Sequence, residues 1–238
     1  MGKSMPKASE AGTHACGDKE GAVPLKRIYK LLRSEFGFLN WWPGETRDEI
    51  LIGAILTQNT SWKNVEKAIA NLREARALSV HEIANASNSH LEGLIRPSGF
   101  YRQKSKRLKR ICSYINGRGG LDKFFRLGLR TLKHELMALN GIGNETADSI
   151  LLYAAGKPVF VIDAYTKRIM SRVYGISEGI DYISLQGIIT KGIERSIPLY
   201  KDFHAQFVEL AKNYCRKKPV CGKCPLKGVC VYASAHRA

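Results

Sequence analysis

The sequence Leu-Asn-Gly-Ile-Gly-Asn-Glu-Thr-Ala-Asp at residues 139–148 predicts a tight turn between two helices. Apolar residues recur at helical spacing on both sides of it, and Gly141 and Gly143 stand where the chain must reverse. Glycine adopts a positive φ at little cost, so both positions suit a sharp turn. A glycine turn that opens onto a helix leaves backbone N–H groups pointing outward at the positive end of the helix dipole. We therefore expect this stretch to bind a phosphate group.

One isolated acid follows this turn. Asp163 comes after the apolar pair Val161 and Ile162 and before a segment with helical character. We therefore hypothesise that the functional centre of the chain is a phosphate-binding turn made of backbone amides, followed by a single acid.

The composition favours a polyanionic partner. The 238 residues carry 38 Lys and Arg against 21 Asp and Glu, a formal net charge of +17. Such an excess indicates nucleic acid more often than a merely solvated surface or membrane headgroups. No apolar run approaches the roughly 20 residues needed to span a bilayer. The N-terminal region lacks the apolar core of a secretory signal, so we expect an intracellular protein, cytoplasmic or nucleoid-associated, that is not secreted.

The spacing of apolar residues predicts a mostly α-helical fold. Strict alternation is almost absent, and no internal repeat is present. Residues 1–22 have no periodicity and are expected to form a disordered tail. Helices are expected at 25–38, in two pieces within 47–72, in two pieces within 77–94, at 121–129, on both sides of the glycine turn, near 183–197 and at 203–214.

Aromatic and polar loops supply candidate binding groups. The sequence Asn-Trp-Trp-Pro-Gly at residues 40–44 predicts a loop that presents Trp41 and Trp42, although either ring could simply cap a core. A polar run precedes Trp62. It could be no more than a turn, or Gln58 and Asn59 could insert into a duplex in place of an extruded base.

The densest basic run lies at residues 102–110, directly after Phe100 and Tyr101. Such a run can be a solvated helix face or a contact for a nucleic-acid backbone. The overall charge and the neighbouring aromatic pair favour backbone contact at least equally.

Four cysteines are clustered near the C-terminus: Cys215, Cys221, Cys224 and Cys230. Four thiolates in one short loop can surround zinc or an iron–sulfur cube. Zinc ribbons usually use two separated Cys-x-x-Cys pairs, whereas this loop has one central pair and an outlying cysteine on each side. The spacing therefore suits a larger cofactor than one zinc ion.

The glycine hairpin, the Asp163 segment and the four-cysteine loop together resemble the helix-hairpin-helix base-excision DNA glycosylases of the endonuclease III type. The resemblance covers roughly residues 25–231. It implies that the four cysteines hold a [4Fe–4S] cluster, that Asp163 is the catalytic acid, and that double-stranded DNA with a damaged base is the partner of a monomeric protein.

The resemblance also implies two all-α domains flanking a DNA-binding groove. Residues 46–154 would form a helical barrel domain that ends in the hairpin motif. Residues 23–45 and 155–238 would form a second helical domain with the cluster loop. Contacts to DNA are expected from Gly141, Gly143, Asn144, Thr146, Gln58 and Asn59.

One departure from the family pattern changes the expected chemistry. Endonuclease III has a lysine two residues after the second hairpin glycine, and this lysine forms a Schiff base with the sugar. This sequence has Glu145 there. A carboxylate cannot form an imine, so we expect a monofunctional enzyme in which Asp163 supports hydrolysis. Glu145 could also simply cap the second hairpin helix.

The aromatic strings are similar to those of the 3-methyladenine branch of this superfamily. That similarity implies a base pocket between Trp41 and Trp62, with Trp42 beside them, and an N-alkylated purine as substrate. The positive charge on such a base favours its departure and its stacking on aromatic faces. A thymine or uracil mismatch glycosylase, a bifunctional glycosylase with lyase activity and a DNA-binding module without catalysis remain as alternatives.

Overall fold

The structure, a computed structural model, describes residues 23–39, 42 and 44–236. All regular elements in these ranges are helical, which confirms the all-α prediction. The expected tail at 1–22 and the candidate pocket residue Trp41 lie outside the described residues.

Helices follow one another through the chain with short connections. Their bounds are α1 Leu25–Phe36, α2 Arg47–Leu56, α3 Trp62–Glu74, α4 Val80–Asn85, α5 Asn88–Ile95, η1 Arg96–Ser98, α6 Tyr101–Gly117, α7 Leu121–Phe125, α8 Leu129–Met137, α9 Asn144–Ser149, η2 Ile150–Ala154, α10 Ala164–Tyr174, α11 Tyr182–Gly192, α12 Ile197–Asn213, η3 Cys221–Lys223 and α13 Val231–Ala235. Of these, η1 and η3 are 3₁₀ turns and η2 is a π-helical turn.

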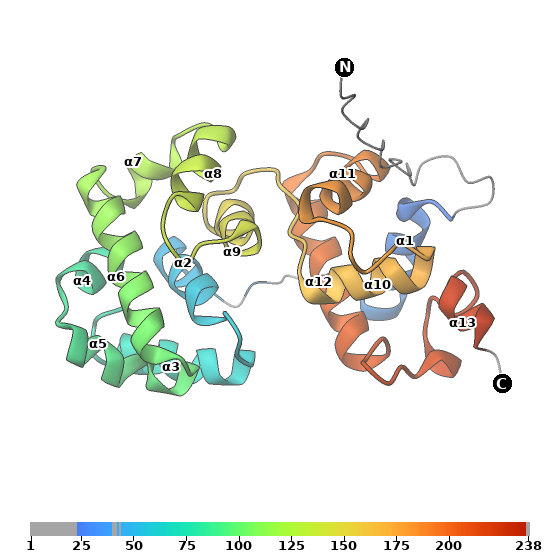
Figure 1. The fold of residues 1–238 in the computed structure, drawn as a ribbon, viewed down its shortest axis with the longest axis horizontal. Coiled ribbons are helices and arrows are strands. Elements are labelled where there is room, and N and C mark those ends of the chain that lie inside the picture. The colour runs from blue at the N-terminus through green and yellow to red at the C-terminus, as the bar shows by residue number, and fades with distance from the viewer. Residues whose placement is uncertain (1–22, 40–41, 43, 237–238) are drawn as a thin grey trace, which may run out of the picture.

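Figure 1 shows these helices in two groups. Helices α2 to α9 gather on one side, and α1 gathers with α10 to α13 on the other. The chain passes between the groups after α1 and again between η2 and α10. The first and last parts of the described chain therefore pack together. The exact residue boundaries of the two expected domains stay a prediction.

Most helix positions agree with the sequence pattern, and several ends differ, among them that of the helix expected at 121–129, which stops at Phe125. The first helix stops at Phe36, not at residue 38, because Gly37 takes a φ of 71°. The helix expected near 183–197 ends at Gly192, because Ile193 is extended. The next helix begins at Ile197 rather than 203, since Ser196 caps it and a proline suits its first turn.

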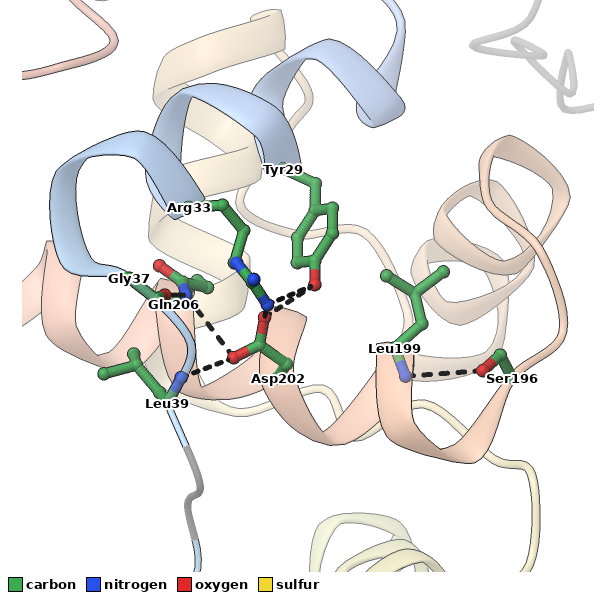
Figure 2. Close-up of polar contacts among 8 residues, drawn as sticks. All are labelled: Tyr29, Arg33, Gly37, Leu39, Ser196, Leu199, Asp202 and Gln206. Atoms are coloured by element: carbon green, nitrogen blue, oxygen red, sulfur yellow. Dashed lines mark hydrogen bonds and ion pairs between the residues drawn. The ribbon is translucent and has the colours of Figure 1, made fainter.

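A buried carboxylate joins the ends of the described chain (Figure 2). Asp202 on α12, with only 1% of its side chain exposed, accepts hydrogen bonds from the Tyr29 hydroxyl at 2.6 Å and the Arg33 guanidinium at 3.0 Å. Its other oxygen accepts the backbone N–H of Leu39 at 2.8 Å. The neighbouring Gln206 donates to the Gly37 carbonyl at 2.7 Å. Helix α12 thereby fixes both α1 and the segment that leads to Trp42.

We expect Asp202→Asn to lower the free energy of unfolding by about 2 kcal/mol, because an amide cannot balance the Arg33 charge or accept every donor around it. Urea denaturation measures this difference. The matched control is Asp122→Asn, since the ion pair of Asp122 with Arg47 at 3.1 Å is exposed on both sides. The control should change stability by under about 0.5 kcal/mol. Equal losses in the two variants would contradict the role given to Asp202.

Candidate active site

A cavity of about 660 Å³ brings together residues from both groups of helices. Its walls come from the α2–α3 loop, the start of α9, the start of α10 and one face of α12. Of the predicted site residues, it contains Trp42, Trp62, Gln58, Asn59, Gly143, Thr146, Glu145 and Asp163. A cavity of this size can hold a nucleobase with its sugar.

Asp163 directly precedes α10 and caps its N-terminus. Its Oδ1 accepts the backbone N–H of Thr166 at 2.7 Å, and its Oδ2 lies 3.6 Å from Nε2 of His204. Burial raises the pKa of the Asp163 carboxyl, but the contacts with His204 and with Thr166 outweigh burial and lower this pKa below its usual value. Asp163 is therefore ionised at neutral pH.

The extended segment before Asp163 is fixed by side chains from α9 and α11. The Ile162 N–H donates to the Tyr182 hydroxyl at 3.2 Å, and Gln186 donates to the Phe160 carbonyl at 2.5 Å. Both Tyr182 and Gln186 also donate to the fully buried carboxylate of Asp148 on α9. The hairpin helix and the catalytic candidate are thus connected through one polar network.

Glu145 lies in the first turn of α9 and lines the same cavity as Asp163. Loss of solvation within the cavity raises the pKa of the Glu145 carboxyl, and the negative charge of Asp163 raises it further. The two carboxyl groups therefore differ: the lowered pKa of Asp163 keeps it ionised, whereas the raised pKa of Glu145 favours its neutral form.

Two described tryptophans form an aromatic wall. The rings of Trp42 and Trp62 meet edge to face, with centroids 5.9 Å apart, and Trp42 lies 4.5 Å from the ring of Tyr153. Trp42 and Trp62 are therefore both part of the cavity and in contact with the core. The expected partner of Trp62, Trp41, lies outside the described residues.

The loop between α2 and α3 is bound to the hairpin. The Gln58 amide donates to the Gly141 carbonyl at 3.1 Å and to the Thr146 hydroxyl at 3.0 Å, and it accepts from Arg107. Asn59 at the loop tip is exposed and has a φ of 53°. Gln58 is therefore held within the protein, and Asn59 is the more accessible of the two predicted insertion residues.

The hairpin glycines have different backbone conformations. Gly141 takes a φ of 91°, and an added Cβ would meet the Arg107 side chain, so this position requires glycine. Gly143 has a φ of −96° and is extended, which any residue can adopt. Gly143 and Asn144 are accessible, whereas the Thr146 side chain is buried against Gln58. The hairpin offers backbone amides, and Thr146 supports the loop instead of presenting its side chain.

The basic run on α6 is not one uniform surface. Lys104 is buried, and its ammonium donates to the carbonyls of Leu56 at 2.8 Å and Ser98 at 2.6 Å. Burial, followed by the nearby charge of Arg107, lowers the pKa of Lys104 to about 8. Lys104 thus holds the C-terminal end of α2 and is not available for backbone contact. Phe100 before this run is 63% exposed at a φ of 45°.

Sequence reasoning missed two residues of the site. His204 on α12 lies against Asp163, and its Nδ1 lies 2.6 Å from the hydroxyl of Tyr153 on η2. Both side chains are 4% exposed. The only signal in the sequence is a histidine within an otherwise apolar helix face, which is more often a core residue than a functional one.

The four clustered cysteines line one small cavity and form no disulfide. Within the described ranges, no three His, Cys, Asp or Glu side chains are gathered tightly enough to hold a single metal ion. Arg172 of α10 donates to Cys215 Sγ at 3.3 Å and to the Arg216 carbonyl at 2.6 Å. Free sulfurs, a nearby guanidinium and apolar walls suit an anionic group larger than one ion.

Comparison with known proteins gives one family. Residues 52–195 match the model of the HhH-GPD superfamily base excision DNA repair protein. A Methanocaldococcus jannaschii protein named as a DNA repair glycosylase is 47% identical over 210 residues, covering 87% of this chain and 96% of that protein. The thymine-DNA glycosylase of Aeropyrum pernix is 28% identical over 188 residues, covering 77% of this chain and 81% of that protein.

A solved structure agrees with these matches. The H. pylori 3-methyladenine DNA glycosylase MagIII, bound to 1,N6-ethenoadenine, has a TM-score of 0.71 at 32% identity, covering 80% of this chain and 98% of that chain. Together with the cavity and its acid, these similarities define the class of DNA N-glycosylases. The chain belongs to the HhH-GPD superfamily of base excision DNA repair proteins.

None of the described helices is both long enough and apolar enough to cross a membrane.

Proposed function

We propose that this glycosylase is monofunctional and hydrolyses the N-glycosidic bond of a flipped, N-alkylated purine, leaving an abasic site. The observation that carries the proposal is the pair of carboxylates, Asp163 and Glu145, that line one cavity with Trp42 and Trp62. Asp163 has a lowered pKa, and Glu145 stands where endonuclease III has its Schiff-base lysine. Together these two residues favour hydrolysis over imine chemistry.

Asp163 supports bond cleavage through its charge. As the base departs, positive charge develops at C1′ of the sugar, and an ionised carboxylate beside it stabilises that charge. The same oxygen atoms orient a water molecule toward C1′ and accept its proton. Glu145 has no amine with which to capture the sugar, so the reaction ends at the abasic site.

The walls of the cavity favour a cationic base. Aromatic rings attract a cation placed over their faces, and the ionised Asp163 carboxylate makes the electrostatic potential of the cavity more negative. An N-alkylated purine carries positive charge and leaves readily without protonation. The 32% identity to the 3-methyladenine glycosylase supports this assignment.

The route of DNA to the cavity follows from the hairpin and the α2–α3 loop. In our proposal, the amides around Gly141, Gly143 and Asn144 bind a backbone phosphate, and the basic faces of the protein attract the duplex. Gln58 and Asn59 border the cavity, and in our proposal they occupy the space in the duplex that the extruded base leaves. Thr146 contributes by holding Gln58 in place.

A second specificity has support from one relative. The Aeropyrum pernix protein is a thymine-DNA glycosylase by name. A neutral base such as thymine needs more assistance to leave than a cationic one, so removal of a mismatched thymine is the second candidate.

We further propose that Cys215, Cys221, Cys224 and Cys230 hold a [4Fe–4S] cluster. A cube of four irons binds one thiolate at each iron, so its ligands lie farther apart than those of a single ion. Such a cluster would stabilise the loop after α12. The sequence spacing of the four cysteines, which line one small cavity, supports a cluster more than zinc.

We expect the protein to release methylated purines faster than uracil or thymine from a panel of duplexes with one lesion each. Asp163→Asn should lower single-turnover base release about a thousandfold, because the charge that stabilises C1′ is lost, while duplex affinity stays within about twofold. Gel-resolved cleavage at abasic sites measures release. Release of mismatched thymine without release of methylated purines would replace the proposed specificity by the second candidate.

We expect borohydride to trap no covalent adduct between the wild-type protein and a lesion duplex. Glu145→Lys should produce an adduct, because an amine then stands beside the sugar. Denaturing electrophoresis separates adduct from free DNA, and Glu145→Gln is the matched control without an amine. Efficient trapping by the wild-type protein would assign lyase activity to another amine, and Lys212, which lines the cavity, would be tested first.

We expect the purified protein to be brown and to contain about four irons per chain. Cys224→Ala should lower both iron content and thermal stability, since one ligand is lost. Cys112→Ala is the matched control, because Cys112 is buried away from the cluster loop and should leave iron content unchanged. A colourless protein with one zinc per chain would contradict the cluster assignment.

A further inference from the structure

We propose that His204 is a positioning residue for the Asp163 carboxylate, and that Tyr153 selects the tautomer of His204 that this role requires. The proposal rests on the proposed role of Asp163 in hydrolysis. It assigns a function to two buried side chains that the sequence pattern alone places in the core.

The three groups form a continuous chain of polar atoms. The Tyr153 hydroxyl lies 2.6 Å from His204 Nδ1, and His204 Nε2 lies 3.6 Å from Asp163 Oδ2. The second carboxylate oxygen of Asp163 accepts the Thr166 N–H. Each oxygen of Asp163 therefore has its own neighbour, and the plane of the carboxylate is fixed between them.

Tyr153 determines which nitrogen of His204 carries hydrogen. Burial, followed by the negative charges of Asp163 and Asp202, raises the pKa of Tyr153 well above its usual value. The phenol therefore stays protonated, and in our proposal it donates its hydrogen to Nδ1. A neutral imidazole that accepts at Nδ1 carries its hydrogen on Nε2, and Nε2 is the atom that faces Asp163.

A donor at this position keeps Asp163 ionised and oriented. At 3.6 Å the contact is longer than an ordinary hydrogen bond and acts mainly through electrostatic attraction. Contacts of this kind often shorten when substrate is bound. Without it, burial would favour protonation of Asp163, which shares the cavity with the Glu145 carboxyl of α9.

The backbone around both residues supports the arrangement. Tyr153 belongs to the π-helical turn η2, a conformation that is rare and often found at functional sites. His204 is two residues from Asp202, which anchors α12 to α1. Other charged groups near this chain are Lys201, whose ammonium lies 5.8 Å from the Tyr153 ring centre, and Lys212, which lines the cavity with Asp163 and His204.

The test measures single-turnover base release from pH 4 to 9 with a methylated-purine duplex. His204→Leu keeps an apolar side chain of similar size but removes the donor. We expect release about tenfold to a hundredfold slower at neutral pH, with duplex affinity unchanged. The acidic limb of the profile should move to higher pH, because Asp163 loses the contact that lowers its pKa while burial remains.

Two further variants separate positioning from packing. His204→Gln, whose amide can donate in place of Nε2, should recover part of the rate. Tyr153→Phe should move the acidic limb in the same direction by a smaller amount, because it removes one hydroxyl and lets the imidazole change tautomer. Tyr200→Phe, which alters a buried tyrosine of α12 outside this chain of polar atoms, should leave the profile unchanged.

An unshifted acidic limb in both His204→Leu and Tyr153→Phe would overturn the inference, because a packing role alone leaves it in place. Should His204→Leu not fold, Tyr153→Phe still decides the question. Activity retained by Asp163→Asn would instead overturn the proposed function. Loss of activity in Asp163→Asn together with an unshifted His204→Leu profile would leave the proposed function standing and reject only the positioning role.

Discussion

The buried carboxylate of Asp202 anchors the elements that position the site. It is buried on α12, where it binds Tyr29 and Arg33 of α1 and the backbone of Leu39. A buried charge is costly unless it is paired, so this network is stable only when α1 and α12 are docked. The segment that leads to Trp42 begins at these contacts. His204 lies two residues after Asp202 on α12. The position of the tryptophan wall and the position of His204 beside Asp163 therefore both depend on the packing of α1 against α12.

The same principle separates the two carboxylates of the cavity. Asp163 has a helix amide and an imidazole next to it, so its charge is stabilised although the group is buried. Glu145 loses solvation within the cavity, and the negative charge of Asp163 raises its pKa further. Two acids in one cavity can therefore hold different protonation states at the same pH, as glycosidic bond cleavage commonly requires.

Local patterns were sufficient to predict much of the fold. Helical spacing, the polar break before Trp62 and the glycine at 141 predicted the elements correctly, because each depends on neighbours within a few residues. Helix ends were wrong where a single cap decides the boundary, as at Gly37 and Ser196.

The site was predictable only in part, for a similar reason. Asp163 and Glu145 lie in recognisable strings, and the structure places both in one cavity. His204 and Tyr153 come from segments far apart in the sequence, and their role arises only from packing. Lys104 lies in the middle of a basic run, and only the packing of α6 against the end of α2 shows that it is buried.

The bonds of Gln58 have a consequence for how the protein surveys DNA. Gln58 is joined to Gly141 and Thr146 of the hairpin and to Arg107, so the loop and the hairpin form one rigid unit. If the hairpin holds a phosphate, Gln58 stands at a fixed offset along the strand from that phosphate. The protein then samples the nucleotide at that offset whatever the surrounding sequence. How readily that base leaves the stack would then decide whether it reaches the cavity, and each step along the backbone would be one independent trial.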